Sequence, residues 1–530
     1  MTAVARRIGR LGQRIGAATQ VEETDVRPLR FPGTFAFIGS GCLLVLEIDA
    51  GRILAPAIGI SLYTWTSVIG VVLAGISLGN WLGGRIADRR PGRSILSYEY
   101  LLGAIASSLI LVLSRDLGAI AAPESWPADL QVLWLAAVMF FLPSLTLGMV
   151  TPMIVKLSLS SLDETGRVVG RIQAAASLGS IVGVFLTGFW LISAFGTRAI
   201  VADVTVALLI LAIVCNPFWA ELPPRAARAA GTVGAGAILV TLVVSVLTIT
   251  YTEDCTRESN YYCIRVSSDE TGQYRQLSLD LLIHGIVNPT DPSQLVYPYE
   301  KLYGQVVDAK YKNPKSPVSA FAIGGGTYTF PQWLAKNHSG TTVVAEIDKE
   351  VTDVAREDLG FRDTPAIRII HKDARPVLRD RPAGERYDLV LGDAFGDIAI
   401  PYHLVTQEFN EIVKDHLKPD GLYLVNVVDG VHYDFLRSYM KTLIKTFPQV
   451  RLIVEPGGAQ GEQNTFVIAA GMVPPPQTQT MASPAQLASF LNERKATILT
   501  DDHVPVDQLL APVFAKRMHE HVSNSDEAGA

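Results

Sequence analysis

The chain has 530 residues, of which 49% are hydrophobic and only 18% are charged, and its formal net charge is −6. Soluble globular proteins carry about 25% charged residues. The composition therefore excludes a disordered chain and a small disulfide scaffold, and it predicts a lipid-facing part. The negative net charge gives no indication of a nucleic-acid partner. The four cysteines show no zinc-binding spacing, so no metal site is expected.

Long apolar stretches fill the first half of the chain and are absent after residue 252. Each is close to the ~20 residues that a helix needs to cross the hydrocarbon core. We therefore predict a cytoplasmic N-terminal segment over residues 1–33 and a transmembrane domain of about seven helices over 34–251. The predicted spans are 34–58, 65–87, 95–113, 130–154, 168–193, 198–216 and 231–251.

Basic residues are distributed unevenly between the two ends of these spans. One side has only Arg52, Arg115 and Arg198. The other side carries Arg6, Arg7, Arg10, Arg14, Arg27, Arg30, Arg85, Arg89, Arg90, Arg93, Lys156, Arg167, Arg171, Arg225 and Arg228. Because cytoplasmic flanks are enriched in Lys and Arg, we predict a multi-pass protein of the cell (inner) membrane with a cytoplasmic N-terminus. Seven crossings would then leave the soluble half outside the cytoplasm.

Two acidic residues, Glu47 and Asp49, fall inside the first predicted span. Carboxylates within a membrane are rare and usually face a cavity or a partner. One interpretation is a polar path or a site for a lipid or substrate. The alternative is a structural pair with a basic residue such as Arg52, or a position close to the membrane interface.

A pair of cysteines, Cys255 and Cys263, lies just beyond the last predicted span, eight positions apart. Disulfides persist in oxidising compartments, so the pair is a candidate disulfide of an extracytoplasmic domain. Two free thiols are the alternative.

The soluble half reads as β-hairpins followed by an α/β domain. Residues 261–300 alternate in polarity and contain turn residues, which predicts a small β-hairpin subdomain over 252–317. Residues 318–530 alternate apolar runs with helical stretches, which is typical of a doubly wound, Rossmann-like domain. Buried strands are expected at 318–323, 342–347, 367–371, 388–392 and 422–428, and helices at about 328–337, 349–358, 403–418 and 432–446.

Glycines or acids follow four successive strands of this domain. The first strand ends in Gly324–Gly326, and the next two end near Glu346 and Asp373. The fourth is followed by Asp393 and Asp397. Ligands of doubly wound sheets bind beyond the carboxyl ends of the strands. Glycines let a ligand approach the backbone, and an acid about 20 residues after them suits a ribose diol. The set predicts a nucleoside site with a neighbouring acidic centre.

These motifs resemble the spermidine synthase family, the polyamine aminopropyltransferases, in its membrane-fused bacterial branch. The soluble half carries the resemblance in 322–326, 346–348, 373–374, 387–393, 406–409 and 500–507, and the membrane half in 44–47 and 75–80. The motifs are more specific for the family than for its activity, because methyltransferases share the nucleoside half of the site.

The resemblance implies an aminopropyl transfer. The co-substrate would be decarboxylated S-adenosylmethionine, with S-adenosylmethionine as the alternative, and no permanently bound cofactor is expected. A small putrescine-like amine would be the acceptor, and methylthioadenosine would leave. Asp393 matches the catalytic aspartate of the family and would act as the base, while Asp397 would bind a remote ammonium of the acceptor.

The resemblance also assigns the other residues of the site. Glu346 would hold the ribose hydroxyls and Asp373 the adenine amine. The donor-binding set is Asn288, Gly324, Gly325, Gly326, Thr327, Glu346, Asp373 and Ala374, and the acceptor-binding set is Asp397, Tyr297 and Tyr402. Membrane lipid is a further expected partner. Because soluble members of the family are commonly dimeric, a homodimer is also expected.

Several positions depart from the family pattern. Thr327 stands where the family has an aspartate that holds the aminopropyl ammonium of the donor. The positions 283–285 and 293–294 also lack acids that the family has. Two alternatives therefore stay open: an S-adenosylmethionine-dependent methyltransferase, or a non-catalytic nucleoside or polyamine sensor or transporter.

Overall fold

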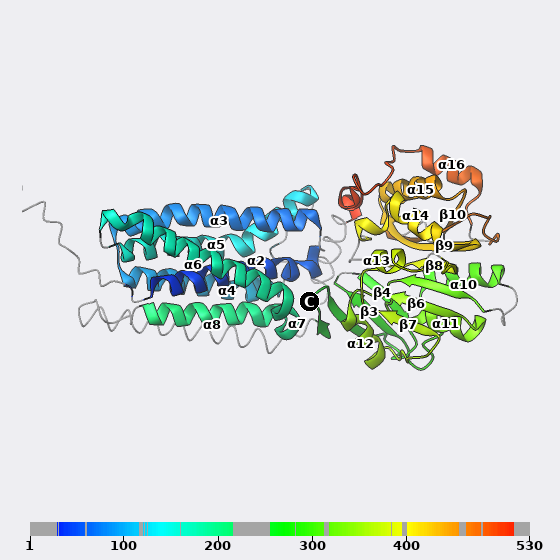
Figure 1. Ribbon diagram of the computed structural model, residues 1–530, viewed down its shortest axis with the longest axis horizontal. Helices are drawn as coiled ribbons and strands as arrows, with labels where there is room; N and C mark the ends of the chain where they lie inside the picture. Colours follow the sequence, from blue (N-terminus) through cyan, green and yellow to red (C-terminus); the bar gives the residue numbers. More distant parts are fainter. Residues whose placement is uncertain are drawn as a thin grey trace, which may run out of the picture.

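The computed structural model describes residues 29, 31–58, 61–115, 120, 122–123, 126–159, 161–215, 255–280, 282–311, 317–382, 384–394, 400–454, 463–478 and 481–513. An elongated bundle of helices forms the N-terminal half, and an α/β half stands at one end of it (Figure 1). A multi-pass helical part followed by a Rossmann-like part is the predicted fold class, and it is confirmed.

Six helical spans in the described part of the bundle are long and apolar enough to cross a membrane. The helices that provide them are α2 (Pro32–Ile58), α3 (Leu62–Arg89), α4 (Arg93–Leu113), α5 (Ala128–Ser158), α6 (Thr165–Leu186) continuing through η3 (Thr187–Leu191) and α7 (Ile192–Phe195), and α8 (Thr197–Cys215). A short 3-10 turn, η2 (Leu162–Glu164), precedes α6. These spans agree with six predicted ones to within a few residues. The predicted seventh span, 231–251, lies outside the described residues, as does most of the segment 1–33.

Glycines allow two pairs of helices in the bundle to pack with their backbones in contact. A Cβ atom at Gly179 of α6 would lie 1.9 Å from the carbonyl oxygen of Phe37 in α2. A Cβ atom at Gly79 of α3 would lie 2.2 Å from the carbonyl oxygen of Leu145 in α5. Small residues at such crossings are a common basis of helix association in lipid.

The bundle has one end at the soluble half and one end away from it (Figure 1). At the near end, the Leu62 N–H donates to Asp507 Oδ2 at 2.8 Å, and the Thr197 N–H donates to Glu258 Oε2 at 2.7 Å. At the far end, Arg93 Nε donates to the carbonyl oxygen of Cys215 at 2.8 Å. The described bundle therefore ends at Cys215, on the far side from the soluble half.

A four-stranded antiparallel sheet opens the soluble half, in the order β1-β2-β3-β4. Its strands are β1 (Arg257–Glu258), β2 (Cys263–Ser268), β3 (Arg275–Leu279) and β4 (Leu282–Val287). Cys255 and Cys263 form a disulfide with their Cα atoms 5.4 Å apart, which joins the start of this half to β2. Helix α10 (Pro298–Lys310) then leads to the main sheet.

The main sheet has seven strands in the order β10-β11-β9-β8-β5-β6-β7. The strands are β5 (Ser319–Ile323), β6 (Thr341–Ala345), β7 (Ile367–Ile370), β8 (Tyr387–Gly392), β9 (Leu417–Gly430), β10 (Gln449–Val454) and β11 (Gln463–Gly471). The strands from β5 to β9 pair in parallel, and β11 pairs antiparallel with both β9 and β10. The sheet is therefore mixed, and its antiparallel edge was not predicted.

Helices cover both faces of the main sheet. They are α11 (Thr329–His338), α12 (Lys349–Glu357), α13 (Ala374–Arg379), α14 (Gln407–Asp415), α15 (Asp434–Thr446) and α16 (Pro484–Asn492), with the short η4 (Tyr402–Leu404) before α14. Alternate residues of β5 point to different cores. Phe321 packs with residues of α14 and α15, whereas Ala322 packs with residues of α10 to α12. This alternation is the packing expected for a strand buried on both faces.

Candidate functional site

Asp393 stands directly after β8, and two buried side chains hold its carboxylate. The hydroxyl of Tyr299 in α10 donates to Oδ2 at 2.5 Å, and the amide of Asn426 in β9 donates to Oδ1 at 2.9 Å. Burial raises the pKa of Asp393, while the two hydrogen bonds oppose that rise. A carboxylate fixed at both oxygens, with its pKa moved toward neutrality, is suited to accept a proton at a defined position.

The loop after β5 passes very close to Asp393. Gly324 has φ of +94°, and a Cβ atom there would lie 2.3 Å from the carbonyl oxygen of Asp393. Only glycine combines that backbone conformation with that approach. A Cβ atom at Gly325 would meet the Tyr328 ring at 2.5 Å. The glycines therefore bring the loop and the acid together at this edge of the sheet.

Glu346 follows β6 and faces the same loop. Its Oε2 accepts the Gly325 N–H at 2.7 Å, and its Oε1 accepts the Asp348 N–H at 2.9 Å. Burial raises the pKa of Glu346 to about 7, although these backbone N–H groups favour the ionised form. Each carboxylate oxygen has a second acceptor site, so the side chain can still accept a hydroxyl donor.

Asp373 follows β7 and caps α13. Its Oδ1 accepts the Arg375 N–H at 2.8 Å, and its Oδ2 lies 2.7 Å from His403 Nε2. The His403 hydrogen bond and the Arg375 N–H hold the pKa of Asp373 below its ordinary value. Ala374, the next residue, is buried at the start of α13. Asp373 is therefore an ionised carboxylate, next along the sheet edge from Glu346.

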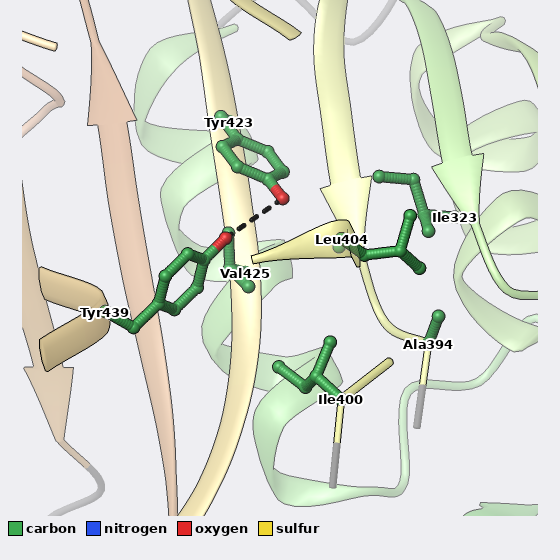
Figure 2. A pocket seen from close by; sticks show the side chains of 8 residues that line it. Ile323, Ala394, Ile400, Leu404, Tyr423, Val425 and Tyr439 are labelled. Atoms are coloured by element: carbon green, nitrogen blue, oxygen red, sulfur yellow. Dashed lines mark hydrogen bonds between the residues drawn. The ribbon is translucent and has the colours of Figure 1, made fainter. Parts of the chain in front are cut away.

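An apolar pocket adjoins the residues on either side of Asp393. Figure 2 shows its lining, which comes from β5, β8, β9 and α15 and from the segment after residue 400. The lining residues are Ile323, Gly392, Ala394, Ile400, Leu404, Tyr423, Val425 and Tyr439. Its polar groups are two tyrosine hydroxyls, which lie 3.2 Å apart. Apart from these two hydroxyls, the lining side chains are apolar.

Other predicted site residues are engaged in local contacts. Asn288 Nδ2 donates to Gln294 Oε1 at 2.9 Å, and its Oδ1 accepts from the Thr290 hydroxyl at 2.7 Å. The Thr327 hydroxyl is 2.8 Å from that of Thr329. The carboxamide of Asn288 is therefore bonded within its own turn, and Thr327 is bonded to the first residue of α11.

The predicted acceptor residues Tyr297 and Tyr402 contact different parts of the site. The Tyr297 hydroxyl donates to the carbonyl oxygen of Ile283 at 3.0 Å, and the Tyr297 ring lies 5.2 Å from that of Tyr299. Tyr402 in η4 is 62% exposed and its ring lies 5.5 Å from His403. Asp397 lies outside the described residues. Tyr297 thus lies beside Tyr299, which binds Asp393, and Tyr402 lies beside His403, which binds Asp373.

The two intramembrane acids differ in burial. Asp49 in α2 is fully buried, and neither carboxylate oxygen has a hydrogen-bond partner within the described part of the chain, whereas Glu47 is partly exposed. Arg52, the basic residue that the sequence suggested as a partner, instead reaches the soluble half. Its guanidinium donates to the carbonyl oxygens of Tyr261 and Ser259. Among the described residues no cluster of His, Cys, Asp and Glu could hold a metal ion.

Four residues near the predicted acids were not identified from the sequence. Tyr299 and Asn426 bind Asp393, and His403 binds Asp373. Glu300 is buried beside Tyr299 with Oε2 lacking a partner in the described structure, and burial together with the Asp393 charge raises its pKa. The sequence around the predicted acids gave no signal for these four residues, because they come from other helices and strands.

Comparison with known proteins finds polyamine aminopropyltransferases and a histidine N-methyltransferase among the sequence relatives. No family model matches the chain. The chain is 27% identical over 221 residues to a probable polyamine aminopropyl transferase of Bifidobacterium longum, a match that covers 36% of this chain and 48% of that protein. It is 29% identical over 179 residues to a polyamine aminopropyltransferase of Hydrogenobaculum, covering 32% of this chain and 61% of that protein.

A search of solved structures finds a probable spermidine synthase from Corynebacterium glutamicum, with 20% identity and a TM-score of 0.40, covering 45% of this chain and 93% of that one. The chain spans about half to three fifths of the length of the two sequence relatives. The resemblance to polyamine aminopropyltransferases is confirmed by these sequence relatives, and with six apolar helical spans the chain has the membrane-fused arrangement.

Proposed function

We propose that this protein transfers an aminopropyl group from decarboxylated S-adenosylmethionine to a small amine, giving a longer polyamine and methylthioadenosine. The observation that carries the proposal is the Asp393 carboxylate, which is held at both oxygens. The Gly324 loop lies against the Asp393 backbone, and Glu346, two strands further along the sheet, binds the same loop. Similarity to polyamine aminopropyltransferases supports the same reaction class.

In the donor half of the site, the nucleoside would lie along the glycine loop. Glu346 would accept hydrogen bonds from the ribose hydroxyls through the acceptor sites that its two backbone N–H bonds leave open. Asp373 would accept from the exocyclic amine of adenine, because it is held as an acceptor by His403 and by the start of α13. The residues therefore support recognition of the nucleoside by two carboxylates.

In the transfer step, the lone pair of a neutral amine attacks the aminopropyl carbon bonded to the sulfonium. The new C–N bond forms as the C–S bond breaks, and the bonding pair moves to sulfur to give a neutral thioether. Free amines have pKa values near 10 and are mostly protonated at neutral pH. Asp393 would take the proton from the amine nitrogen, with Tyr299 and Asn426 keeping its oxygens in place.

Acidic groups in the rest of the site also suit a cationic substrate. Glu300 provides a buried carboxyl group next to Tyr299, and an ammonium bound beside it would favour its ionised form against the effect of burial. The position after the glycines, Thr327, offers only a hydroxyl. We therefore assign the acidic character of the site to Asp393 and Glu300, with Asp397 as a further acceptor-binding acid in this proposal.

The proposal includes an extracytoplasmic soluble half. The soluble half contacts the bundle at the α2–α3 and α7–α8 turns, through Asp507 and Glu258. Basic residues of that end are few, whereas Arg85, Arg89, Arg90 and Arg93 flank the opposite turn between α3 and α4. The positive-inside rule then favours a cytoplasmic far end whatever the total number of spans. The Cys255–Cys263 disulfide is also consistent with an oxidising compartment.

Reporter fusions at the C-terminus test this orientation. An alkaline phosphatase fusion is expected to be active, and a matched fluorescent-protein fusion that folds only in the cytoplasm is expected to be dark. The opposite pattern would contradict the orientation and leave the reaction itself untouched.

Mass spectrometry of reaction products tests the reaction. The purified full chain in detergent is incubated with decarboxylated S-adenosylmethionine or with S-adenosylmethionine, each beside a panel of diamines. Methylthioadenosine together with an amine heavier by one aminopropyl group is the expected result. S-adenosylhomocysteine would instead establish methyl transfer, and nucleoside binding without any product would establish the sensor or transporter alternative.

A further inference from the structure

Buried hydrogen bonds connect the membrane half to the glycine loop. The connection begins at Arg52, near the end of α2 that faces the soluble half. Its guanidinium donates to the carbonyl oxygens of Ser259 and Tyr261 and lies 3.9 Å from the carboxylate of Asp280. Because 7% of the Arg52 side chain and none of the Asp280 side chain is exposed, these contacts are shielded from water.

The Ser259 side chain carries the connection into the Rossmann-like part. Its hydroxyl donates to Asp348 Oδ2 at 2.5 Å and accepts the backbone N–H groups of Tyr261 and Tyr262 at 3.0 and 2.9 Å. The segment that Arg52 binds through its carbonyls is therefore the same segment that presents the Ser259 hydroxyl to Asp348.

Asp348 connects Ser259 to the donor site. Its Oδ1 accepts the Glu350 N–H at 2.9 Å and caps α12, and its own N–H donates to Glu346 Oε1 at 2.9 Å. Glu346 Oε2 in turn accepts the Gly325 N–H at 2.7 Å. Since Ser259, Asp348 and Glu346 are 1%, 3% and 7% exposed, losing one bond leaves a buried polar atom without compensation from solvent.

We infer that Arg52 and Ser259 are positioning residues of the donor site, which act on Glu346 through Asp348, so that the membrane bundle is a structural part of nucleoside binding. The inference rests on the proposed function, because the donor-binding role of Glu346 belongs to it. It gives the membrane half a role in affinity for the donor in addition to anchoring.

Binding of methylthioadenosine to the full chain in detergent tests the inference, with isothermal titration as the measurement. Ser259→Ala is expected to weaken binding about tenfold, because it leaves the Asp348 carboxylate without its buried donor. Ser259→Thr, which keeps the hydroxyl, is expected to restore most of the affinity. Ser268→Ala, an exposed serine of β2, is the matched control and is expected to bind as the unaltered chain does.

A second variant, Arg52→Lys, changes a residue of the membrane half and leaves the sequence of the soluble half unchanged. Arg52→Lys cannot reach both carbonyls with a planar fork, and we expect methylthioadenosine affinity to fall several-fold. In turnover, both variants should raise the KM for the donor while kcat and the KM for the amine stay within about twofold, because Asp393 and its partners lie outside this connection.

The outcomes separate the inference from the proposed function. If the unaltered chain does not bind methylthioadenosine, the proposed function fails. If it binds and both Ser259→Ala and Arg52→Lys bind equally well, the inference is wrong and the bundle is only an anchor. If Ser259→Ala does not fold, as judged by thermal unfolding and gel filtration, Arg52→Lys alone decides between the two results.

Discussion

Replacing Tyr299 with Phe removes one hydrogen bond from the Asp393 carboxylate and leaves the ring in place. The bond measures 2.5 Å and joins the hydroxyl of the buried Tyr299 to the partly buried carboxylate of Asp393. Hydrogen bonds to charged groups contribute about 1.5–3 kcal/mol. A pKa change of one corresponds to about 1.36 kcal/mol, so the substitution should raise the pKa of Asp393 by about one to two.

The sign follows from which form the bond stabilises. Tyr299 donates to the ionised carboxylate and lowers the Asp393 pKa against the effect of burial. Without it the carboxyl keeps its proton to a higher pH, and a protonated carboxyl cannot act as a base. The acid limb of kcat/KM against pH should therefore move upward by about one to two pH units.

The assay is the initial rate of methylthioadenosine formation across the pH range, at fixed ionic strength and with a saturating amine. Tyr303→Phe is the matched control, because Tyr303 lies one turn later in α10 and donates to the carbonyl oxygens of Gly392 and Leu424 instead. Its acid limb should coincide with that of the unaltered chain. An acid limb for Tyr299→Phe that also coincides would refute the assignment of Asp393 as the base held by Tyr299.

Three further predictions follow from the geometry. Burial raises the pKa of Glu346 to about 7, so the folded chain holds a proton there that the unfolded chain releases near pH 4.3. Because the ionised carboxylate is the acceptor for the ribose hydroxyls, methylthioadenosine affinity should rise between pH 6 and pH 8. Titration calorimetry should find no such dependence in Glu346→Gln. Gly324→Ala places a Cβ atom 2.3 Å from the Asp393 carbonyl oxygen at a φ of +94°. It should lower the free energy of unfolding by at least about 1–3 kcal/mol. Gly384→Ala is the control, because a Cβ atom there meets no atom within 4 Å, and it should leave thermal unfolding unchanged. Gly79→Leu should separate α3 from α5 and lower the thermal stability of the bundle in detergent, while Gly70→Leu, which also meets no atom within 4 Å, should not.

The sequence was sufficient for features that depend on one segment at a time. Six of the predicted spans coincide with helices because a length of apolar residues is a local property. The glycines at 324–326 and the acids Glu346, Asp373 and Asp393 all stand at the ends of strands, which alternating apolar runs locate directly. For the same reason α11, α12 and α15 begin and end within about two residues of their predicted bounds.

Features that depend on contacts between distant segments could not be predicted in this way. Tyr299 and Asp393 are 94 positions apart, and nothing in either segment indicates the other. Strands β10 and β11 were missed because their antiparallel pairing places them at the edge of a sheet that otherwise follows strand–helix alternation. Arg52 was considered only as a partner for acids of its own span, yet it contacts residues more than 200 positions later.

The central claim, that Asp393 is the base for transfer to an amine, is tested most directly by Asp393→Asn. Its rate of methylthioadenosine release would be compared with that of the unaltered chain at saturating decarboxylated S-adenosylmethionine and amine. Removal of a general base typically costs 10²–10⁴-fold, so we expect a rate lower by about that factor. Methylthioadenosine binding should stay within about twofold, since the neutral amide can still accept from Tyr299. An Asp393→Asn variant that binds the nucleoside and releases product at the unaltered rate would contradict the claim.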